Sequence, residues 1–121
     1  MSEQQQIAII GWIDVDPAVR DRVVADTADI QRSTREDEAG CLTYAITADP
    51  VDPARIQIVE LWQDAASLEA HFLHPNFTAT GAVIRAVPRS GGSTMKYRID
   101  AHEQVRGPEG VASARFKSAG D

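Results

Sequence analysis

Four segments of the chain have the composition or the apolar–polar alternation of β-strands. The first is rich in β-branched residues, and the later three alternate with a period of two. In the third segment this period places Glu60 and Trp62 on one face and Val59 and Leu61 on the other. The predicted strands are 7–15, 41–48, 55–62 and 93–104.

A first helix is predicted from 17 to 37, because apolar residues recur there at steps of three and four. Asp16 can accept hydrogen bonds from the unpaired amides of the first turn, and Pro17 suits a position whose amide would have no partner. Gly40 is suited to the left-handed backbone that often follows a helix end. These signals place one long helix between the first two strands.

A second helical region follows the third strand. Asp64 can cap a short helix that carries Phe72 on its apolar side. The residue before a proline is disfavoured in helical geometry, so His74 should end this helix and Pro75 should begin another. We expect residues 88–92 to close the region before the last strand.

The predicted order is strand, helix, strand, strand, helix, strand, which is that of the ferredoxin-like βαββαβ fold. This α+β fold has a four-stranded antiparallel sheet with both helices on one face, and it would span residues 1–104. The bare face would expose Val59 and Leu61 to water, a cost that pairing of two sheets removes, so we predict a homodimer. Residues 105–121, which are polar and rich in Gly, Ala and Ser, are predicted to be a tail or a dimer arm.

The composition is that of one ordinary globular domain of 121 residues. A net charge of −6 with scattered Lys and Arg argues against nucleic-acid binding, which needs clustered positive charge. No apolar run reaches the roughly 20 residues that span a bilayer, and the N-terminus lacks the basic segment of a secretory signal. The single Cys41 fits a reducing cytoplasm, which is the expected location.

His71 and Glu60 are the first candidates for chemistry. His71 lies at the edge of the helix face that should contact the sheet, and Glu60 points to the same side from the adjacent strand. A buried carboxylate is costly unless it is paired, and a histidine within reach is a suitable partner. Such a pair would fix one imidazole tautomer and raise its basicity, which suits a general base. The same pair could instead only tie the helix to the sheet, and both roles stay open.

Aromatic side chains near these two residues are candidates for a ligand pocket. Tyr44 and Trp62 lie on strand faces that should look toward the helices, where they could line a pocket for a flat aromatic ligand or fill the core. Phe72 lies on the apolar face of its helix, and Asn76 and Phe77 could form the rim just after the helix break.

Charged groups and metal ligands add little to this picture. Arg98 or Lys96 on the last strand would steady a developing anion if the strand turns them inward. His71 and His74 are three residues apart, but no cysteine or acidic residue completes a metal-ligand spacing. There is no glycine-rich phosphate loop and no nucleophile elbow. The sequence therefore predicts chemistry without a cofactor, or binding alone.

Several short motifs, taken in order, resemble the antibiotic biosynthesis monooxygenase family, and the resemblance covers about residues 7–103. They are Glu38-x-Gly40-Cys41-Leu42-x-Tyr44, the strand end Glu60-Leu61-Trp62, and the helix Ala66-Ser67-Leu68-Glu69-Ala70-His71-Phe72 followed by Pro75-Asn76-Phe77. The resemblance implies a dimeric ferredoxin-like α/β barrel. The chain differs from the haem-degrading branch of the superfamily, because His71 stands where that branch has a tryptophan and Gly81 where it has a histidine.

The resemblance also implies a cofactor-independent monooxygenase that oxidises a small quinol-like or polyketide-type aromatic substrate with dioxygen, without flavin or metal. His71 would be the base that deprotonates the substrate, and the substrate anion would then give an electron to dioxygen. Glu60 would orient His71, and Trp62 and Tyr44 would form the pocket walls. Two alternatives stay open: a non-catalytic protein that binds an aromatic metabolite, and an isomerase of a small carbonyl compound that uses the same pocket.

Overall fold

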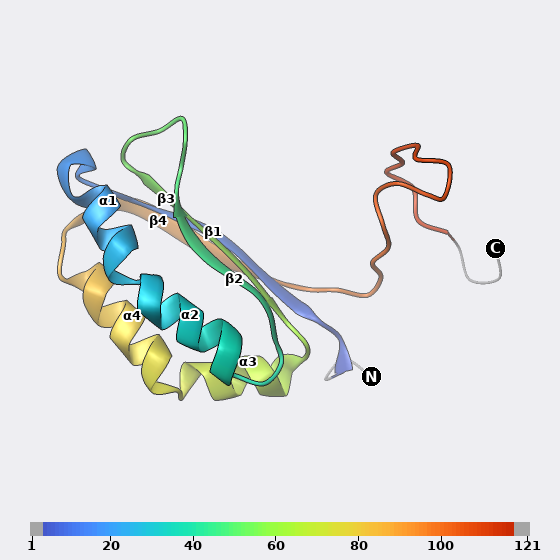
Figure 1. Cartoon of the computed structure of the whole chain (residues 1–121), viewed down its shortest axis with the longest axis horizontal. Helices are drawn as coiled ribbons and strands as arrows, with labels where there is room; N and C mark the ends of the chain where they lie inside the picture. The colour runs from blue at the N-terminus through green and yellow to red at the C-terminus, as the bar shows by residue number, and fades with distance from the viewer. Residues whose placement is uncertain (1–3, 118–121) are drawn as a thin grey trace.

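The computed structural model describes residues 4–117. Its strands form one antiparallel sheet, and every helix lies on the same face of that sheet (Figure 1). The elements are β1 (Ile7–Val15), α1 (Pro17–Asp26), α2 (Ala28–Asp37), β2 (Cys41–Ala48), β3 (Arg55–Trp62), α3 (Ala65–Phe72), α4 (Pro75–Arg85) and β4 (Arg89–Arg98). The strand order is β2-β3-β1-β4, and all neighbours are antiparallel. The predicted ferredoxin-like fold is therefore confirmed.

The single helix predicted for residues 17–37 is wrong, because the chain forms two helices that meet at Thr27. Thr27 is fully buried, and its hydroxyl donates to the carbonyl oxygen of Val24 at 2.8 Å. A threonine hydroxyl that bonds the preceding turn competes with the regular helical ladder. The break allows the Gln31 side chain to bond both the N–H and the carbonyl oxygen of Ile46, at 3.0 Å each, which ties α2 to the edge strand β2.

The last strand lies earlier in the chain than the predicted 93–104, because β1 sets both of its ends. Ile7 pairs with Arg98 and Val15 pairs with Arg89, so the segment expected to be a loop extends the sheet. A side chain at Gly92 would press against Ile13 and the backbone of β1. Glycine therefore permits the close pairing there.

Residues 99–117 leave the sheet and run away from the helices and strands (Figure 1). The amide of Ile99 still donates to the carbonyl oxygen of Gln6 at 2.9 Å, and one isolated bridge joins Arg106 to Ala112 further on. The ends of the chain, residues 1–3 and 118–121, lie outside the described residues, and they include the end of the predicted tail. The domain boundary at residue 104 stays a prediction.

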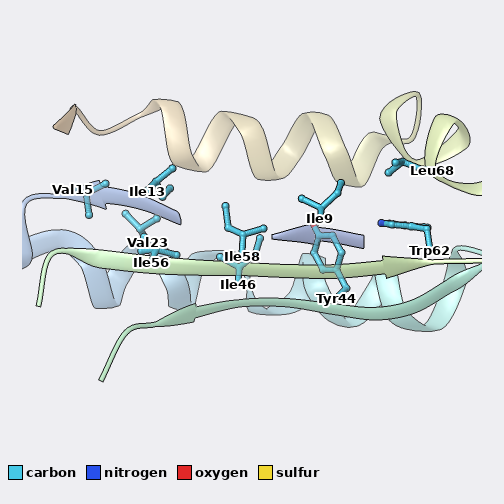
Figure 2. Packing of buried hydrophobic residues seen from close by; sticks show 10 residues of the cluster. All are labelled: Ile9, Ile13, Val15, Val23, Tyr44, Ile46, Ile56, Ile58, Trp62 and Leu68. Carbon is cyan, nitrogen blue, oxygen red and sulfur yellow. The ribbon is translucent and has the colours of Figure 1, made fainter. Parts of the chain in front are cut away.

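The core lies between the sheet and the helices, where alternate residues of the strands meet the apolar sides of α1, α3 and α4 (Figure 2). Trp62 and Ile56 are completely buried at its two ends. Its buried apolar members are Ile9, Ile13, Val15, Val23, Tyr44, Ile46, Ile56, Ile58, Trp62 and Leu68.

The opposite face of the sheet is bare and apolar. Ile10 is 49% exposed there, and its register partners Val59 and Met95 flank it on β3 and β4. Tyr97, two residues after Met95 and therefore on the same face of β4, is also exposed. The predicted exposure on this face is confirmed for Val59, whereas Leu61 is only partly exposed. Among residues 4–117, no helix is long and apolar enough to cross a membrane.

Candidate active site

A pocket of about 630 Å³ lies between the sheet and the α3–α4 pair. β1, β3 and β4 form its floor, and one phenylalanine from each helix forms its wall. The lining residues are Ile9, Glu60, Phe72, Phe77, Thr94, Met95 and Lys96. Met95 takes part from between Thr94 and Lys96 on the edge strand β4, where the register places its side chain with Ile10 on the other face. The pocket is therefore apolar, with one carboxyl and one ammonium group, which suits a flat ligand that carries an acidic or polar group. Of the predicted site residues, Glu60, Phe72, Phe77 and Lys96 line it.

Glu60 is the ionisable group that β3 directs into this space. It is only 9% exposed, and its Oε1 accepts a hydrogen bond from Nε1 of Trp62 at 2.9 Å. Burial raises the pKa of the Glu60 carboxyl, and the Trp62 hydrogen bond and the His71 imidazole oppose that rise. A carboxylate in this position is more basic than one in water and can exchange a proton with a bound ligand.

The predicted pairing of His71 with Glu60 is wrong, because His71 is paired with another carboxylate. Nδ1 of His71 lies 2.7 Å from Oε1 of Glu38, and the side chains are 1% and 5% exposed. A carboxylate can only accept, so Nδ1 carries a hydrogen, and in the neutral ring the lone pair is then on Nε2. Within residues 4–117, Nε2 of His71 is buried and has no hydrogen-bond partner.

The connection between α2 and β2 explains this pairing. Gly40 has a positive φ of 87° and packs so closely on Ser67 that a Cβ at residue 40 would collide with it. The amide of Gln63 donates to the carbonyl oxygen of Gly40 at 2.8 Å. These contacts bring the connection against the start of α3, and Glu38 then faces His71 one helix turn further on. One oxygen of Glu60, Oε1, accepts from Trp62 instead.

Asn76 holds the second oxygen of Glu38. Its Nδ2 donates to Oε2 of Glu38 at 3.0 Å and lies 3.1 Å from Oγ of Ser33. Asn76 was predicted at the pocket rim, but the structure places it in this partly buried network around Glu38. His74, predicted at the surface, is partly exposed, and its Nδ1 accepts from the amide of Asn76 at 3.0 Å to cap α4.

Tyr44 and Trp62 were predicted to be pocket walls, and they lie one layer behind the pocket instead. Both are buried around His71, with ring centroids 5.4 Å and 4.6 Å from the imidazole. Phe77, which does line the pocket, lies 5.5 Å from the same ring. Burial raises the pKa of the Tyr44 phenol strongly, so the phenol is neutral at physiological pH. His71 is therefore enclosed by aromatic rings and contacts the pocket through Phe77.

The two basic residues of β4 both face the helices, but only Lys96 lines the pocket. The register pairs Lys96 with Ile9 and Arg98 with Ile7, so each shares the buried face of β1. Arg98 lies one pair beyond the lining residues, and its predicted contact with the ligand is not supported. In the part of the chain that the structure describes, no three or more His, Cys, Asp or Glu side chains group as metal ligands do.

Glu38 is the residue of this site whose role the sequence did not reveal. It belongs to the motif before the second strand, but it ends a helix with many charged neighbours and looks like part of a solvated surface. The useful signal was Gly40 two residues later. A glycine required by close packing indicates that the residues beside it are also drawn into the interior.

The fold and the site define a ferredoxin-like α+β protein with an apolar, carboxyl-containing pocket between its sheet and two helices. The sequence model of the antibiotic biosynthesis monooxygenase family matches residues 6–83, more than half of the chain, and the chain belongs to this family. Among curated proteins, none matches the chain.

Solved structures share the fold across most of the chain. A Caulobacter crescentus protein provisionally named antibiotic biosynthesis monooxygenase is 23% identical, with a TM-score of 0.72 over 84% of this chain and 93% of that one. A Deinococcus radiodurans protein with the same provisional name is 19% identical, with a TM-score of 0.73 over 84% and 99%. A further structure named antibiotic biosynthesis monooxygenase is 28% identical, with a TM-score of 0.66 over 80% and 99%.

Proposed function

We propose that this protein is a cofactor-independent monooxygenase that oxidises a small quinol-like or polyketide-type aromatic compound with dioxygen. The observation that carries the proposal is the position of Glu60, a buried carboxyl group with a raised pKa in the lining of an otherwise apolar pocket. An aromatic ring can lie against Phe72 and Phe77 while its acidic O–H or C–H group meets Glu60. Membership of the family supports the same reaction class.

Glu60, not His71, is the base that contacts the substrate in this proposal. Glu60 lines the pocket, whereas His71 is enclosed behind it. Trp62 holds one oxygen of Glu60 and leaves the other for the substrate proton. Lys96 lines the same pocket and provides positive charge for the substrate anion and for the reduced oxygen that forms from it.

The reaction balances without an added reductant. Consider a substrate with an acidic CH₂ group between aromatic rings: Glu60 removes one proton, and the resulting carbanion transfers an electron to dioxygen and combines with it. The substrate peroxide takes the proton back and loses water, which leaves a carbonyl group. One oxygen atom enters the product and the other leaves as water. The four electrons come from the substrate carbon.

We also propose that the protein is a homodimer in the cytoplasm. The exposed apolar row of Ile10, Val59 and Met95 suits a second copy of the same sheet face, because pairing the two faces removes both from water. Residues 99–117 reach beyond the domain and carry exposed Val105 and Phe116, which supports a role as an arm that packs on the partner. A single thiol, Cys41, suits a reducing compartment.

Oxygen uptake tests the activity directly. After dialysis against a chelator, the wild type should consume dioxygen with an anthrone or a naphthoquinol as probe. Glu60→Gln should lower kcat about 100-fold or more, the usual contribution of a general base. Glu69→Gln is the control, because it removes an exposed carboxyl group from the helix that carries His71, and its kcat should stay within twofold of the wild type.

The same assay separates the rival functions. If Glu60→Gln keeps the wild-type rate, the proposed base is wrong. If the probes quench the fluorescence of Trp62 without product, the protein is a binding protein. Conversion of a carbonyl compound under anaerobic conditions would identify an isomerase.

A further inference from the structure

We propose that Glu38 and His71 form a buried proton acceptor behind the pocket, to which Glu60 passes the proton it takes from the substrate. Glu38 is then a positioning residue for the reaction, and His71 is the group that holds the proton during the oxygen step. This inference rests on the proposed function and deepens it.

The first support is the tautomer of His71. Glu38 accepts from Nδ1 at 2.7 Å, so the lone pair of the neutral ring is on Nε2. That nitrogen is buried and unpaired among the described residues. Buried polar atoms in folded proteins nearly always have a partner, and an exception requires an explanation. A nitrogen kept free to receive a proton provides that explanation.

The second support is the charge balance in the interior. A lone carboxylate at Glu38 is costly to bury, and protonation of Nε2 converts the pair into an ion pair with no net charge. A proton stored at this position therefore removes a buried net charge. The same carboxylate arrangement holds an imidazole for proton transfer in catalytic triads.

The third support is the set of groups that face the His71 ring. Tyr44 from β2 is neutral, and His74 at the start of α4 uses its Nδ1 to accept from the amide of Asn76. This leaves Glu60 from β3, the carboxyl group whose hydrogen-bond partner Trp62 packs directly on the His71 ring.

Trp62 connects Glu60 to the His71 ring. Its indole N–H holds Oε1 of Glu60, and its ring lies 4.6 Å from the His71 ring with an angle of 33° between the planes. The indole therefore fixes Glu60 and packs on the imidazole at once. The proton path is substrate to Glu60, then to Nε2 of His71, and back by the same route to the substrate peroxide, so no proton is lost in the cycle.

Nitrogen NMR of the resting protein tests the acceptor without any substrate. The ¹⁵N shifts of the His71 ring should show a protonated Nδ1 and an unprotonated Nε2 at neutral pH. Glu38→Gln should disturb this tautomer, and Ser33→Ala should leave it unchanged. Ser33 is the matched control, because it bonds Asn76 in the same network and does not contact His71. A protonated Nε2 in the wild type would overturn the inference.

Kinetics test the role in turnover. Glu38→Gln should lower kcat at least tenfold with KM within twofold, because substrate binding involves the pocket and not the acceptor. Ser33→Ala should keep kcat within twofold. Wild-type kcat in folded Glu38→Gln would overturn the acceptor role. If the wild type itself shows no oxygen uptake, the proposed function and the acceptor role both fail, and NMR still decides the tautomer by itself.

Discussion

The indole N–H of Trp62 donates to Oε1 of Glu60 at 2.9 Å, and the two residues lie two positions apart on the buried face of β3. The bond satisfies one oxygen of a carboxyl group that has little other access to water. Burial raises the pKa of Glu60 by more than the Trp62 hydrogen bond lowers it, so the net shift is upward. The fold therefore keeps an ionisable group in a place where an amide would cost less, as enzymes often do at reactive sites.

Replacement of Glu60 by glutamine should separate stability from activity. The folded pKa of Glu60 exceeds the ordinary value of 4.5, so the folded state binds more protons than the unfolded state between these two values. The contribution of Glu60 to the free energy of unfolding is fully present below pH 4.5 and is lost as the pH rises through the folded pKa. Glutamine at this position does not ionise, so Glu60→Gln does not lose stability in this way as the pH rises, and its amide oxygen can still accept from Trp62. At pH 7 it should unfold at the same urea concentration as the wild type or a higher one.

Urea unfolding between pH 4 and pH 8 measures this effect, and Glu69→Gln controls for a general loss of negative charge. The exposed Glu69 should give a curve parallel to that of the wild type. The assignment fails if Glu60→Gln and wild type show the same dependence on pH.

Gly40 should be essential for the position of Glu38. Gly40→Ala puts a side chain at a φ of 87° and into Ser67, so we expect a loss of at least ~1–2 kcal/mol in the free energy of unfolding. Gly107→Ala is the control, because no described atom would lie within 4 Å of its Cβ. Chemical denaturation of the two variants gives the comparison. Equal stabilities would show that the connection tolerates displacement and that the glycine has no packing role.

Local signals in the sequence predicted most of the fold. Asp64 caps α3 by accepting from the amide of Ser67 at 2.8 Å, and Asp16 caps α1 in the same way. Such caps involve residues two or three positions apart, and strand alternation depends on only a few neighbours, so both can be read without tertiary information. The break at Thr27 escaped prediction, because a buried threonine that bonds Val24 looks like any other helical residue in the sequence.

The site was predicted less well, because its central contact joins residues that are 33 positions apart. Glu60 was correctly placed on the helix side of β3, and its proximity to His71 followed from that placement. Whether His71 would bond Glu60 or Glu38 depended on how the α2–β2 connection packs on α3. That packing is set by Gly40 and by the chain that surrounds it, and no spacing in the sequence encodes it.

Phe77 should contribute binding energy and little catalysis. Its ring lies 5.1 Å from that of Phe72 and 5.5 Å from that of His71, and it lines the pocket. Loss of one aromatic contact costs about 0.5–1.5 kcal/mol, so Phe77→Ala should raise KM for an aromatic probe by roughly two- to tenfold. Leu73→Ala is a matched control, since Leu73 is 84% exposed and does not line the pocket. Steady-state oxygen uptake with both variants decides the point, and an unchanged KM for Phe77→Ala would place the ligand elsewhere.

The bare face of the sheet should hold two copies together. Val59→Lys puts a charge beside Ile10 in the row of Val59, Ile10 and Met95, and pairing would then bury an unpaired ammonium group. We expect the wild type to sediment at twice the 13.1 kDa chain mass and Val59→Lys to sediment as a single chain with unchanged far-UV circular dichroism. Val51→Lys, at an 88% exposed turn position, adds the same charge away from this face and should remain dimeric. A wild-type species of 13.1 kDa at micromolar concentration would show that the apolar row is left exposed. In that case the dimer is wrong, whatever the activity of the pocket on the other side of the sheet.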